Sequence, residues 1–415
     1  MTRVDVKRRL NPCTFLAVAA SAALFAAVLF NIGSFSIDPR YAPPETETSP
    51  TSTPWPTSIR FTGPELGINV HMWWDPWAAV ARDWSLIDEG GFTWVKQRLS
   101  WHDVEGAGPG RYEWTSADRI VDEANQLGIN LVFRVDMPPV WAMPEENSPD
   151  YTRIPAYPEA FQHFCYELAS RYQDRVRGYQ VWNEPNLARE WRDQTPNPEA
   201  YVALLRACYF GVKTADPDAL VISAGLAPTG SGLPEAIPDV TYLSAMYEAG
   251  AAPYFDLLGL NAPGYKAPPE LSPEVVTDPD SGFGGHPTFC FRHVENMRAV
   301  METYGDANKQ IAILEFGWHS DTNPEHEDYA WFAVTPEQQA DYLVRAYQYA
   351  HEHWASWVGP MFVWNFPDPK WTPENEEFWW SVADPFWWGA GEDMSTWKGG
   401  AVRPAYLALK ALRVP

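Results

Sequence analysis

Eight short runs rich in β-branched and aromatic residues recur between residues 66 and 365, and longer amphipathic stretches separate most of them. The runs are residues 66–72, 92–100, 129–136, 176–183, 219–225, 255–261, 310–317 and 357–365. Their composition and length are typical of strands buried on both faces, and strands that alternate with helices form a parallel sheet. Eight such units predict a closed (β/α)8 TIM barrel, whose usual size matches this part of the chain.

The amphipathic stretches predict helices, most clearly at residues 158–172, 197–215 and 335–354. The last two place a proline at the first helical position, after an asparagine or threonine that can act as the N-terminal cap. A doubly wound sheet is the main alternative fold, but nucleotide-binding proteins of that fold carry a glycine-rich phosphate loop after the first strand. No G-x-G-x-x-G follows residues 66–72, and no P-loop or G-x-S-x-G motif occurs. Nucleotide-binding and serine-hydrolase functions are therefore disfavoured.

The chain of 415 residues is acidic, with a formal net charge of −24. Binding to nucleic acid depends on Lys and Arg side chains that neutralise phosphates. We therefore expect no nucleic-acid partner, and a neutral ligand suits this surface best. Oligomeric state is left open by the sequence.

The N-terminal residues read as a targeting segment. Basic residues precede an uncharged apolar run from Phe15 to Ile32, which is longer than an ordinary signal-peptide core and just long enough to span a bilayer. Residues 1–36 are thus predicted to be a signal anchor or signal peptide, with the uncleaved anchor favoured. Either form directs the body out of the cytoplasm, membrane-anchored or secreted. Residues 37–60, rich in Pro, Thr and Ser, predict an extended linker, and residues 61–415 the catalytic domain.

Four cysteines leave the disulfide state open. Cys13 lies at the predicted membrane edge, and Cys165, Cys208 and Cys290 cannot all pair with one another. We expect buried thiols in the body of the chain. A Cys165–Cys208 bridge between neighbouring helices is the alternative, because the predicted compartment permits it.

Two glutamates stand where catalytic residues of a barrel are found, at the C-terminal ends of strands. Glu184, in "VWNEPN", follows the fourth predicted strand, and Glu315, in "ILEFGW", ends the seventh. Two carboxylates that face one cavity suit glycoside cleavage, in which one protonates the leaving oxygen and the other attacks the anomeric carbon. Carboxyl groups about 5 to 5.5 Å apart imply retention, and a wider gap implies inversion. A structural role is the better interpretation for one such glutamate alone, but not for both together.

These two motifs resemble glycoside hydrolase clan A, the retaining (β/α)8 glycosidases. Residues 95–135 begin with "VKQRLSW" and end with "INLVFRV". This stretch is similar to the second βα unit of the cellulase-like family 5 and of family 39, the β-xylosidases and α-L-iduronidases. The stretch "VRPAYLALKAL", residues 402–412, is similar to their last helix. The resemblance covers residues 66–412.

The resemblance implies a role for individual residues. Glu184 would be the general acid/base and Glu315 the nucleophile. Asn183 would hydrogen-bond the substrate 2-hydroxyl, a contact that strengthens in the transition state. Trp364 would form the aromatic floor under the sugar that is cleaved. Glu184 should then have a raised pKa, and Glu315 should stay ionised.

Two further positions match the clan less closely. Tyr265 is the counterpart of a tyrosine that touches the nucleophile, although "NAPGYK" departs from the usual His-x-Tyr pattern. The second strand of these enzymes offers an arginine near the site. Lys96 occupies the better matching position here, and Arg98 lies on the same strand face two residues on. Either cation could stabilise the nucleophile as an anion.

The chain contains 22 tryptophans, and core packing is the first explanation for any one of them. However, residues 364–391 crowd tryptophans into a Pro- and Gly-broken loop at the predicted catalytic end, where we expect a sugar-stacking platform. Other tryptophans at strand ends could add substrate subsites: Trp73, Trp74, Trp101, Trp141 and Trp318.

No metal or cofactor is expected. Residues 319–328, "HSDTNPEHED", collect histidines and carboxylates, but their spacing matches no zinc motif and lacks the central glycine of an EF-hand loop. We interpret this stretch as a solvated loop. "HEHW" at residue 351 lacks the H-E-x-x-H spacing of metalloproteases.

The sequence therefore predicts a retaining glycoside hydrolase that cleaves β-glycosidic bonds of neutral poly- or oligosaccharides by double displacement. The alternatives are a carbohydrate-binding pseudoenzyme, a scaffold protein that uses the barrel as a rigid body, and a transglycosidase on the same site. Sugar identity, linkage and exo or endo action are not fixed by the sequence, because specificity depends on loops of unknown shape.

Overall fold

A computed structural model describes residues 60–73, 77–145, 155–323, 326–387 and 398–412. Eight parallel strands form a closed barrel in chain order, and β1 closes it by pairing with β8. The strands are β1 (Glu65–Val70), β2 (Trp94–Ser100), β3 (Asn130–Asp136), β4 (Gly178–Val181), β5 (Leu220–Ser223), β6 (Leu257–Pro263), β7 (Gln310–Gly317) and β8 (Val358–Val363). All eight predicted strands and the predicted (β/α)8 barrel are confirmed.

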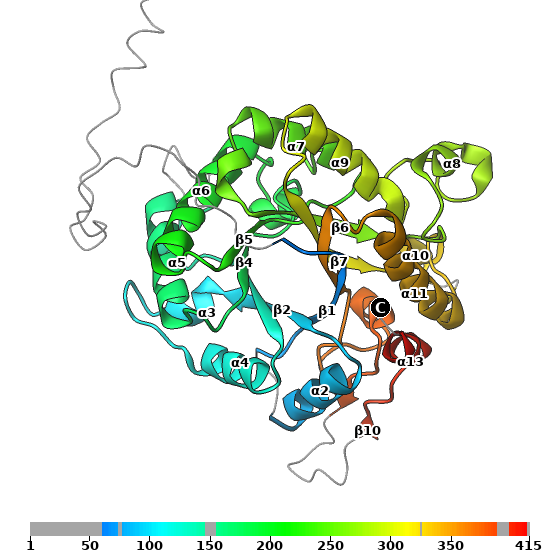
Figure 1. Cartoon of the computed structure of the whole chain (residues 1–415), viewed down its shortest axis with the longest axis horizontal. Helices are drawn as coiled ribbons and strands as arrows, with labels where there is room; N and C mark the ends of the chain where they lie inside the picture. The colour runs from blue at the N-terminus through cyan, green and yellow to red at the C-terminus, as the bar shows by residue number, and fades with distance from the viewer. Residues whose placement is uncertain (1–59, 74–76, 146–154, 324–325, 388–397, 413–415) are drawn as a thin grey trace, which may run out of the picture. The chain divides into compact units, whose positions relative to one another are not determined.

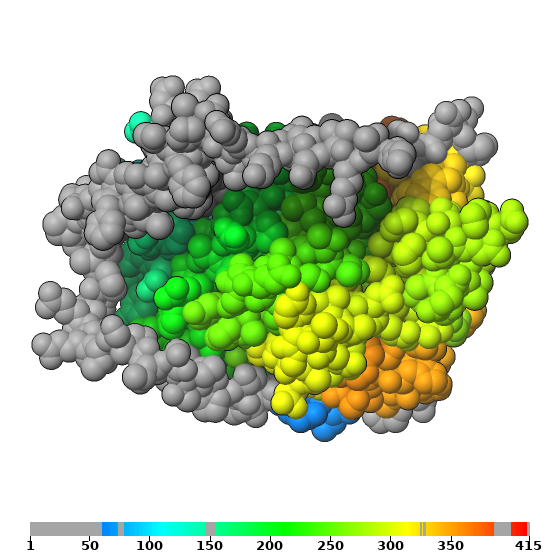
Figure 2. Space-filling view, turned by 90° about the horizontal axis from the view of Figure 1, so that it is seen from above, coloured from blue at the N-terminus to red at the C-terminus, as the bar shows by residue number. Residues whose placement is uncertain are grey.

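Helices surround the strands (Figure 1), and α5 packs on α6, α6 on α7, and α7 on α9. Seen from above, the surface passes from green residues through yellow to orange ones (Figure 2). The helices are α2 (Trp77–Glu89), α3 (Trp101–Glu105), α4 (Thr115–Gln126), α5 (Pro158–Arg171), α6 (Pro198–Ala215), α7 (Asp239–Glu248), α8 (Pro273–Thr277), α9 (Val294–Thr303), α10 (Glu327–Ala330), α11 (Pro336–His353), α12 (Glu376–Trp380) and α13 (Pro404–Ala411). A small antiparallel pair, β9 (Phe386–Trp387) and β10 (Lys398–Gly399), follows α12.

The predicted helices begin within one residue of the expected positions, because their caps work as the sequence indicates. The side chain of Asn197 accepts a hydrogen bond from the Ala200 amide at the start of α6. Thr335 and Gln338 form a reciprocal capping box at the start of α11, and both helices have proline in the first turn.

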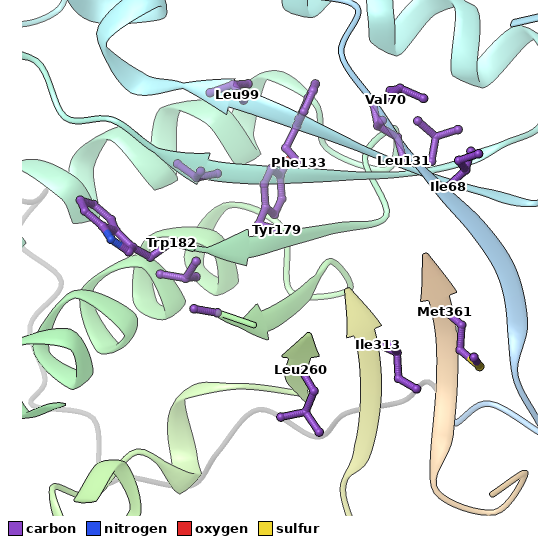
Figure 3. Packing of buried hydrophobic residues seen from close by; sticks show 14 of the residues in the cluster. Ile68, Val70, Leu99, Leu131, Phe133, Tyr179, Trp182, Leu260, Ile313 and Met361 are labelled. Atoms are coloured by element: carbon purple, nitrogen blue, oxygen red, sulfur yellow. The ribbon is translucent and has the colours of Figure 1, made fainter. Parts of the chain in front are cut away.

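The core has two layers, which follow from the alternation of side chains along each strand. Outward-facing residues pack between strands and helices. Phe133 and Tyr179, partners on β3 and β4, are examples that lie side by side in Figure 3. A second, smaller cluster consists of Trp94, Val132, Leu257, Leu314, Phe362 and four other buried apolar residues. Several of its members lie near the starts of their strands, so polar residues can face inward near the strand ends.

The N-terminal prediction cannot be compared with the fold, because residues 1–59 lie outside the described ranges. Within those ranges, no helix combines the length and the apolar character needed to cross a bilayer. The predicted signal segment and linker stay predictions, as does localisation.

A disulfide bond joins Cys165 on α5 to Cys208 on α6. The expectation of buried thiols was wrong for this pair, and the alternative bridge is correct. The two helices pack so closely that the Cα atoms lie 5.3 Å apart, within the range that a disulfide spans. Cys290 is a buried free thiol, as expected.

Replacing both bridged cysteines by alanine should lower the free energy of unfolding by about 4 kcal/mol, because the bridge closes a long loop in the unfolded chain. The two cysteines are 43 residues apart. Urea unfolding with and without reductant would measure the effect. Cys290→Ala should keep the response to reductant, and an unchanged midpoint in the double variant would contradict the prediction.

Candidate active site

A cavity of about 1140 Å³ opens at the C-terminal ends of the barrel strands and contains both predicted glutamates. Its floor is polar: Asn69, Lys96, Arg134 and Asn261, from four different strands, line it. The fold therefore brings together Glu184 and Glu315, which are 131 residues apart in sequence.

Glu184 follows β4 in a turn with the unusual backbone angle φ +35°. This conformation is uncommon for a residue with a side chain, and it costs on the order of 1–3 kcal/mol. The Glu184 amide donates to the Gly225 carbonyl at 3.1 Å, which ties the turn to the end of β5. The strained turn directs the carboxylate into the cavity instead of along the strand.

The pKa of Glu184 is raised above its ordinary value of 4.5, first by burial and second by the negative charge of Glu315. Two contacts oppose this shift. Arg189 Nη2 donates to Oε2 at 3.0 Å, and Asn261 Nδ2 donates to Oε1 at 3.0 Å. The raised pKa predicted for Glu184 is confirmed, and its main cause is desolvation.

Glu315 enters the cavity through an irregularity in β7. Leu260 pairs with Ile313, but the next residue of β6, Asn261, pairs with Glu315, so Leu314 is an extra residue. Such a bulge re-aims the side chain that follows it. Leu314 belongs to the second, smaller cluster inside the barrel, while Glu315 lines the cavity. Two consecutive side chains of β7 therefore face inward.

Two cations lie against Glu315. Lys96 Nζ donates to Oε1 at 3.0 Å, and Arg134 Nη1 lies 3.8 Å from the same oxygen. Burial lowers the pKa of Lys96 to about 8, although the charge of Glu315 opposes that shift. The predicted pairing of a second-strand cation with Glu315 is therefore present at Lys96. Arg98 instead forms an ion pair with Asp136 at 2.8 Å and lines the cavity.

Asn261 lies between the two glutamates. Its Nδ2 donates to Glu184 Oε1 at 3.0 Å and to Glu315 Oε2 at 3.2 Å. The two acceptor oxygens can be no farther apart than the sum of these distances. The two carboxylates are thus held as a close pair by one neutral amide.

Asn183 and Trp364 line the cavity, as predicted. Asn183 is buried directly before Glu184, and Trp364 follows β8 and is half-buried. The Trp364 ring meets His71 edge to face at 5.5 Å, and Trp371 meets the same histidine at 4.6 Å. Burial lowers the pKa of His71 to about 3, so the imidazole that lines the cavity is uncharged at neutral pH.

Tyr265 lines the cavity, but its hydroxyl donates to the Pro228 carbonyl at 3.2 Å. No hydrogen bond from this hydroxyl to Glu315 is present in the described structure. The Tyr265 ring packs against Phe289 and Trp331. The neighbour that donates to Glu315 from β6 is Asn261 instead.

Trp318 is assigned to the core, which corrects the prediction of a sugar subsite there. The side chain is fully buried, and its indole nitrogen donates to the Ala267 carbonyl. It lies over Gly264, where a Cβ would come within 1.9 Å of the ring. Trp73 and Trp101 are buried too, and Trp74 lies outside the described residues.

Trp141 is half-buried and is not one of the residues that line the cavity. Its indole nitrogen donates to the Glu105 carbonyl, and its ring packs edge to face on Trp101 at 5.6 Å. These contacts hold Trp141 against α3, outside the residues that line the cavity.

The tryptophan-rich loop that follows β8 contributes Trp364, Trp371 and Trp380 to the cavity wall. Phe332 packs on Trp380 at 6.1 Å and lines the same wall. Three tryptophans of the predicted platform therefore line the cavity, and their role in sugar stacking stays a prediction. Residues 388–391 of the predicted platform lie outside the described ranges.

The histidine- and carboxylate-rich stretch after β7 does not gather into a metal site in the described part of the chain. His326 pairs with Asp321, and His319 is buried between Tyr329, Phe332 and Trp380. His319, Ser320 and Asp321 are buried, so the prediction of a solvated loop was wrong for the start of this stretch.

Sequence reasoning missed three polar residues that contact the glutamates: Asn261, Arg134 and Arg189. Asn261 ends the sixth predicted strand, so its place at the catalytic end was a usable signal. Arg134 alternates with buried apolar residues inside β3, where a charge is unusual. Arg189 lies in a short 3-10 helix, Ala188–Trp191, whose direction cannot be read from the sequence.

No protein-family model matches the sequence, and the comparison with curated proteins found no match. Solved structures do match. A family 39 glycoside hydrolase from Bacteroides cellulosilyticus WH2 is 21% identical, with a TM-score of 0.58, over 85% of this chain. The chain spans 64% of the length of that protein.

Two other similar structures cover the same share of this chain, 85% in each case. A GH10 endoxylanase from a sugarcane soil metagenome is 13% identical with a TM-score of 0.54, over 98% of its own length. A monomeric β-xylosidase from Caulobacter crescentus CB15 is 17% identical with a TM-score of 0.51, over 69% of its length. Together with the closed parallel barrel, these likenesses show that the chain has the (β/α)8 fold of the clan A glycoside hydrolases.

Proposed function

We propose that the protein is a retaining glycoside hydrolase that cleaves β-glycosidic bonds of neutral poly- or oligosaccharides. The observation that carries the proposal is the pair of glutamates at the ends of β4 and β7, bridged by Asn261 Nδ2 at 3.0 and 3.2 Å. The sum of these two distances falls short of the roughly 6.5 Å at which inverting separations begin. A separation of the bridged oxygens below the inverting range supports double displacement.

In the first step, a carboxylate oxygen of Glu315 forms a bond to the anomeric carbon while the glycosidic C–O bond breaks. The proton of Glu184 passes to the leaving oxygen, so the aglycone departs as an alcohol. In the second step, ionised Glu184 takes a proton from water, whose oxygen attacks the same carbon and releases Glu315. The raised pKa of Glu184 and the cations beside Glu315 support this division of roles.

The surrounding residues support sugar binding. Trp364 offers an aromatic face in the cavity, and the Asn183 side chain lies beside Glu184, where it can bind the sugar hydroxyl next to the anomeric carbon. The lining cations are already paired with carboxylates: Lys96 and Arg134 near Glu315, Arg98 with Asp136, and Arg189 with Glu184. Because these cations are occupied, a neutral sugar fits better than a uronate.

We also propose that the protein works outside the cytoplasm, anchored through its N-terminal segment or secreted. The Cys165–Cys208 bridge supports this proposal, since disulfides persist in oxidising compartments. The apolar run of residues 15–32 supports a membrane partner.

The test is turnover of a panel of aryl β-glycosides (xyloside, glucoside, galactoside and mannoside) by the full chain, with the anomeric configuration of the first product read by NMR. We expect turnover of at least one member with retention of configuration. Inverted product would overturn the double-displacement mechanism. Oligosaccharide binding without turnover of any aryl or natural glycoside would favour the binding pseudoenzyme instead, and transfer to added sugar would identify a transglycosidase.

A further inference from the structure

Among the described residues, Asn261 is the only one whose side chain hydrogen-bonds both Glu184 and Glu315. A primary amide carries two N–H groups, so each carboxylate can take one of them. Unlike Lys96 or Arg189, the amide adds no charge and does not titrate. Asn261 can therefore hold two carboxylates close together without pairing either one as an ion.

The barrel places this amide through three local features. Asn261 faces the cavity near the C-terminal end of β6, where it pairs with Glu315 on β7. The β7 bulge brings Glu315 rather than Leu314 opposite it. Gly225 leaves the necessary space, because a Cβ there would lie 2.1 Å from Asn261 Oδ1.

The orientation of the amide is set by what surrounds it. Asn261 is buried, and no donor in the described structure reaches its Oδ1. A buried oxygen without a partner costs about 1–3 kcal/mol, which the fold tolerates here. In the reversed orientation, the amide oxygen would face two carboxylates and be repelled by both. Leaving Oδ1 unpaired costs less free energy than that repulsion.

The contacts also distinguish the two oxygens of Glu184. Oε1 accepts from Asn261, whereas Oε2 accepts from Arg189. The Arg189 side chain is 70% exposed, so it can swing away from the cavity, while Asn261 is fixed in the barrel. Oε2 is thus the oxygen that becomes available to hold a proton and face a leaving group.

We propose that Asn261 is a positioning residue that fixes the reactive geometry of both glutamates, with Oε2 of Glu184 as the proton-donating oxygen. The inference rests on the proposed function for its catalytic meaning. Asn261 occupies Oε1 of Glu184 and Oε2 of Glu315, which sets the rotation of each carboxylate about its last bond. The same neutral bridge serves both steps, since it donates to the carboxylates whether or not Oε2 of Glu184 holds the proton.

The first test is Asn261→Leu, which keeps the approximate size and removes both donors. We expect kcat to fall about 10²-fold, the loss that follows removal of one preorganised donor, with a smaller change in KM. Because Glu315 also loses its orientation, the loss should persist for a dinitrophenyl glycoside, whose leaving group needs no proton. Thermal unfolding shows whether the variant is folded.

Asn261→Asp is the isosteric companion. At neutral pH it places a third carboxylate beside the pair, and we expect a larger loss than in Asn261→Leu. Below the pH at which the introduced carboxylate takes a proton, its single O–H can donate to one glutamate, so part of the activity should return. Recovery toward acid pH is a signature that a purely structural role does not produce.

Arg189→Ala is the matched control, because it removes a donor from Glu184 without touching Glu315. Arg189 and Asn261 both lower the pKa of Glu184, so loss of either should move the alkaline limb of the rate profile to higher pH. Only Asn261→Leu should slow the formation of the covalent intermediate from the dinitrophenyl substrate. Equal loss on that substrate in both variants would overturn the assignment to Asn261.

The proposal and the proposed function can fail separately. If the parent turns over glycosides and Asn261→Leu keeps its kcat and pH profile, Asn261 is not a positioning residue and the glycosidase stands. If the parent is inactive on every glycoside, the proposed function fails. The bridge is then tested by NMR titration of 13C-labelled glutamate: a higher titration midpoint for Glu184 in Asn261→Leu supports it, and an unchanged midpoint overturns it.

Discussion

Replacing Glu315 by glutamine should lower kcat about 10⁵-fold, in the range seen when a catalytic nucleophile is removed. The amide is nearly the same size, but it is a poor nucleophile and carries no charge to pair with Lys96 Nζ at 3.0 Å. The loss should be similar for good and poor leaving groups, because no covalent intermediate can form. Steady-state rates on the best aryl glycoside of the panel would measure it.

Glu248→Gln is the matched control for that experiment. Glu248 lies on α7, is exposed, and accepts a hydrogen bond from the Tyr304 hydroxyl outside the cavity. It should keep the parent rate. In the parent, mass spectrometry should find a 2-fluoro glycoside attached to the peptide that contains Glu315. Labelling of a different residue would remove Glu315 from the nucleophile role.

Replacing Glu184 by glutamine should give a loss that depends on the leaving group. We expect kcat/KM to fall about 10²- to 10⁴-fold for natural glycosides, the usual contribution of general acid catalysis. A dinitrophenyl glycoside should form the covalent intermediate at nearly the parent rate, because its leaving group departs without a proton. The fall in kcat/KM at alkaline pH should disappear in Glu184→Gln, because the variant has no acid at this position to lose its proton. Rate profiles for both substrates would test these expectations.

The second step gives an independent check on Glu184. Without a base to activate water, the intermediate should accumulate, and azide should react with it in Glu184→Ala. The product should be a glycosyl azide with the configuration of the substrate. An azide product of inverted configuration would contradict a covalent intermediate on Glu315.

The same residue should affect stability. The pKa of Glu184 is raised in the folded state, so the folded protein binds its proton more tightly than the unfolded chain does. Stability is therefore lost as pH rises above the ordinary value of 4.5, and the full cost is present above the raised pKa. Glu184→Gln should raise the thermal midpoint at neutral pH, with the gain vanishing below pH 4.5. A gain that is equal at both pH values would contradict this explanation.

Much of the site could be predicted because strand ends are local features of the sequence. Glu184 and Glu315 each follow a run that reads as a strand, and a barrel gathers such ends at one face. Lys96, which lies inside β2, was instead identified through the resemblance to clan A, whose second strand offers a cation near the site. Trp318 satisfies the same rule and is nevertheless buried, because Gly264 lets its ring pack inward. Position at a strand end therefore selects candidates without fixing exposure.

The residues that were missed act through contacts between elements. Asn261 depends on a bulge in β7 and on the space left by Gly225, and neither feature has a sequence signature. Arg189 reaches Glu184 from a short 3-10 helix. The Cys165–Cys208 bridge depends on how closely α5 and α6 pack. Each contact joins segments whose spacing is set by tertiary packing.

The sequence by itself determined the eight strands, the helix caps and the two glutamates, because periodicity, capping and strand order are properties of the local chain. Only the tertiary structure decided that Asn261 joins the two carboxylates, which tryptophans line the cavity, and which cation pairs with Glu315. Those outcomes depend on local register and on the approach between elements, such as the register shift made by the extra residue Leu314 in β7. A local pattern cannot specify them, because the partner atoms belong to other strands.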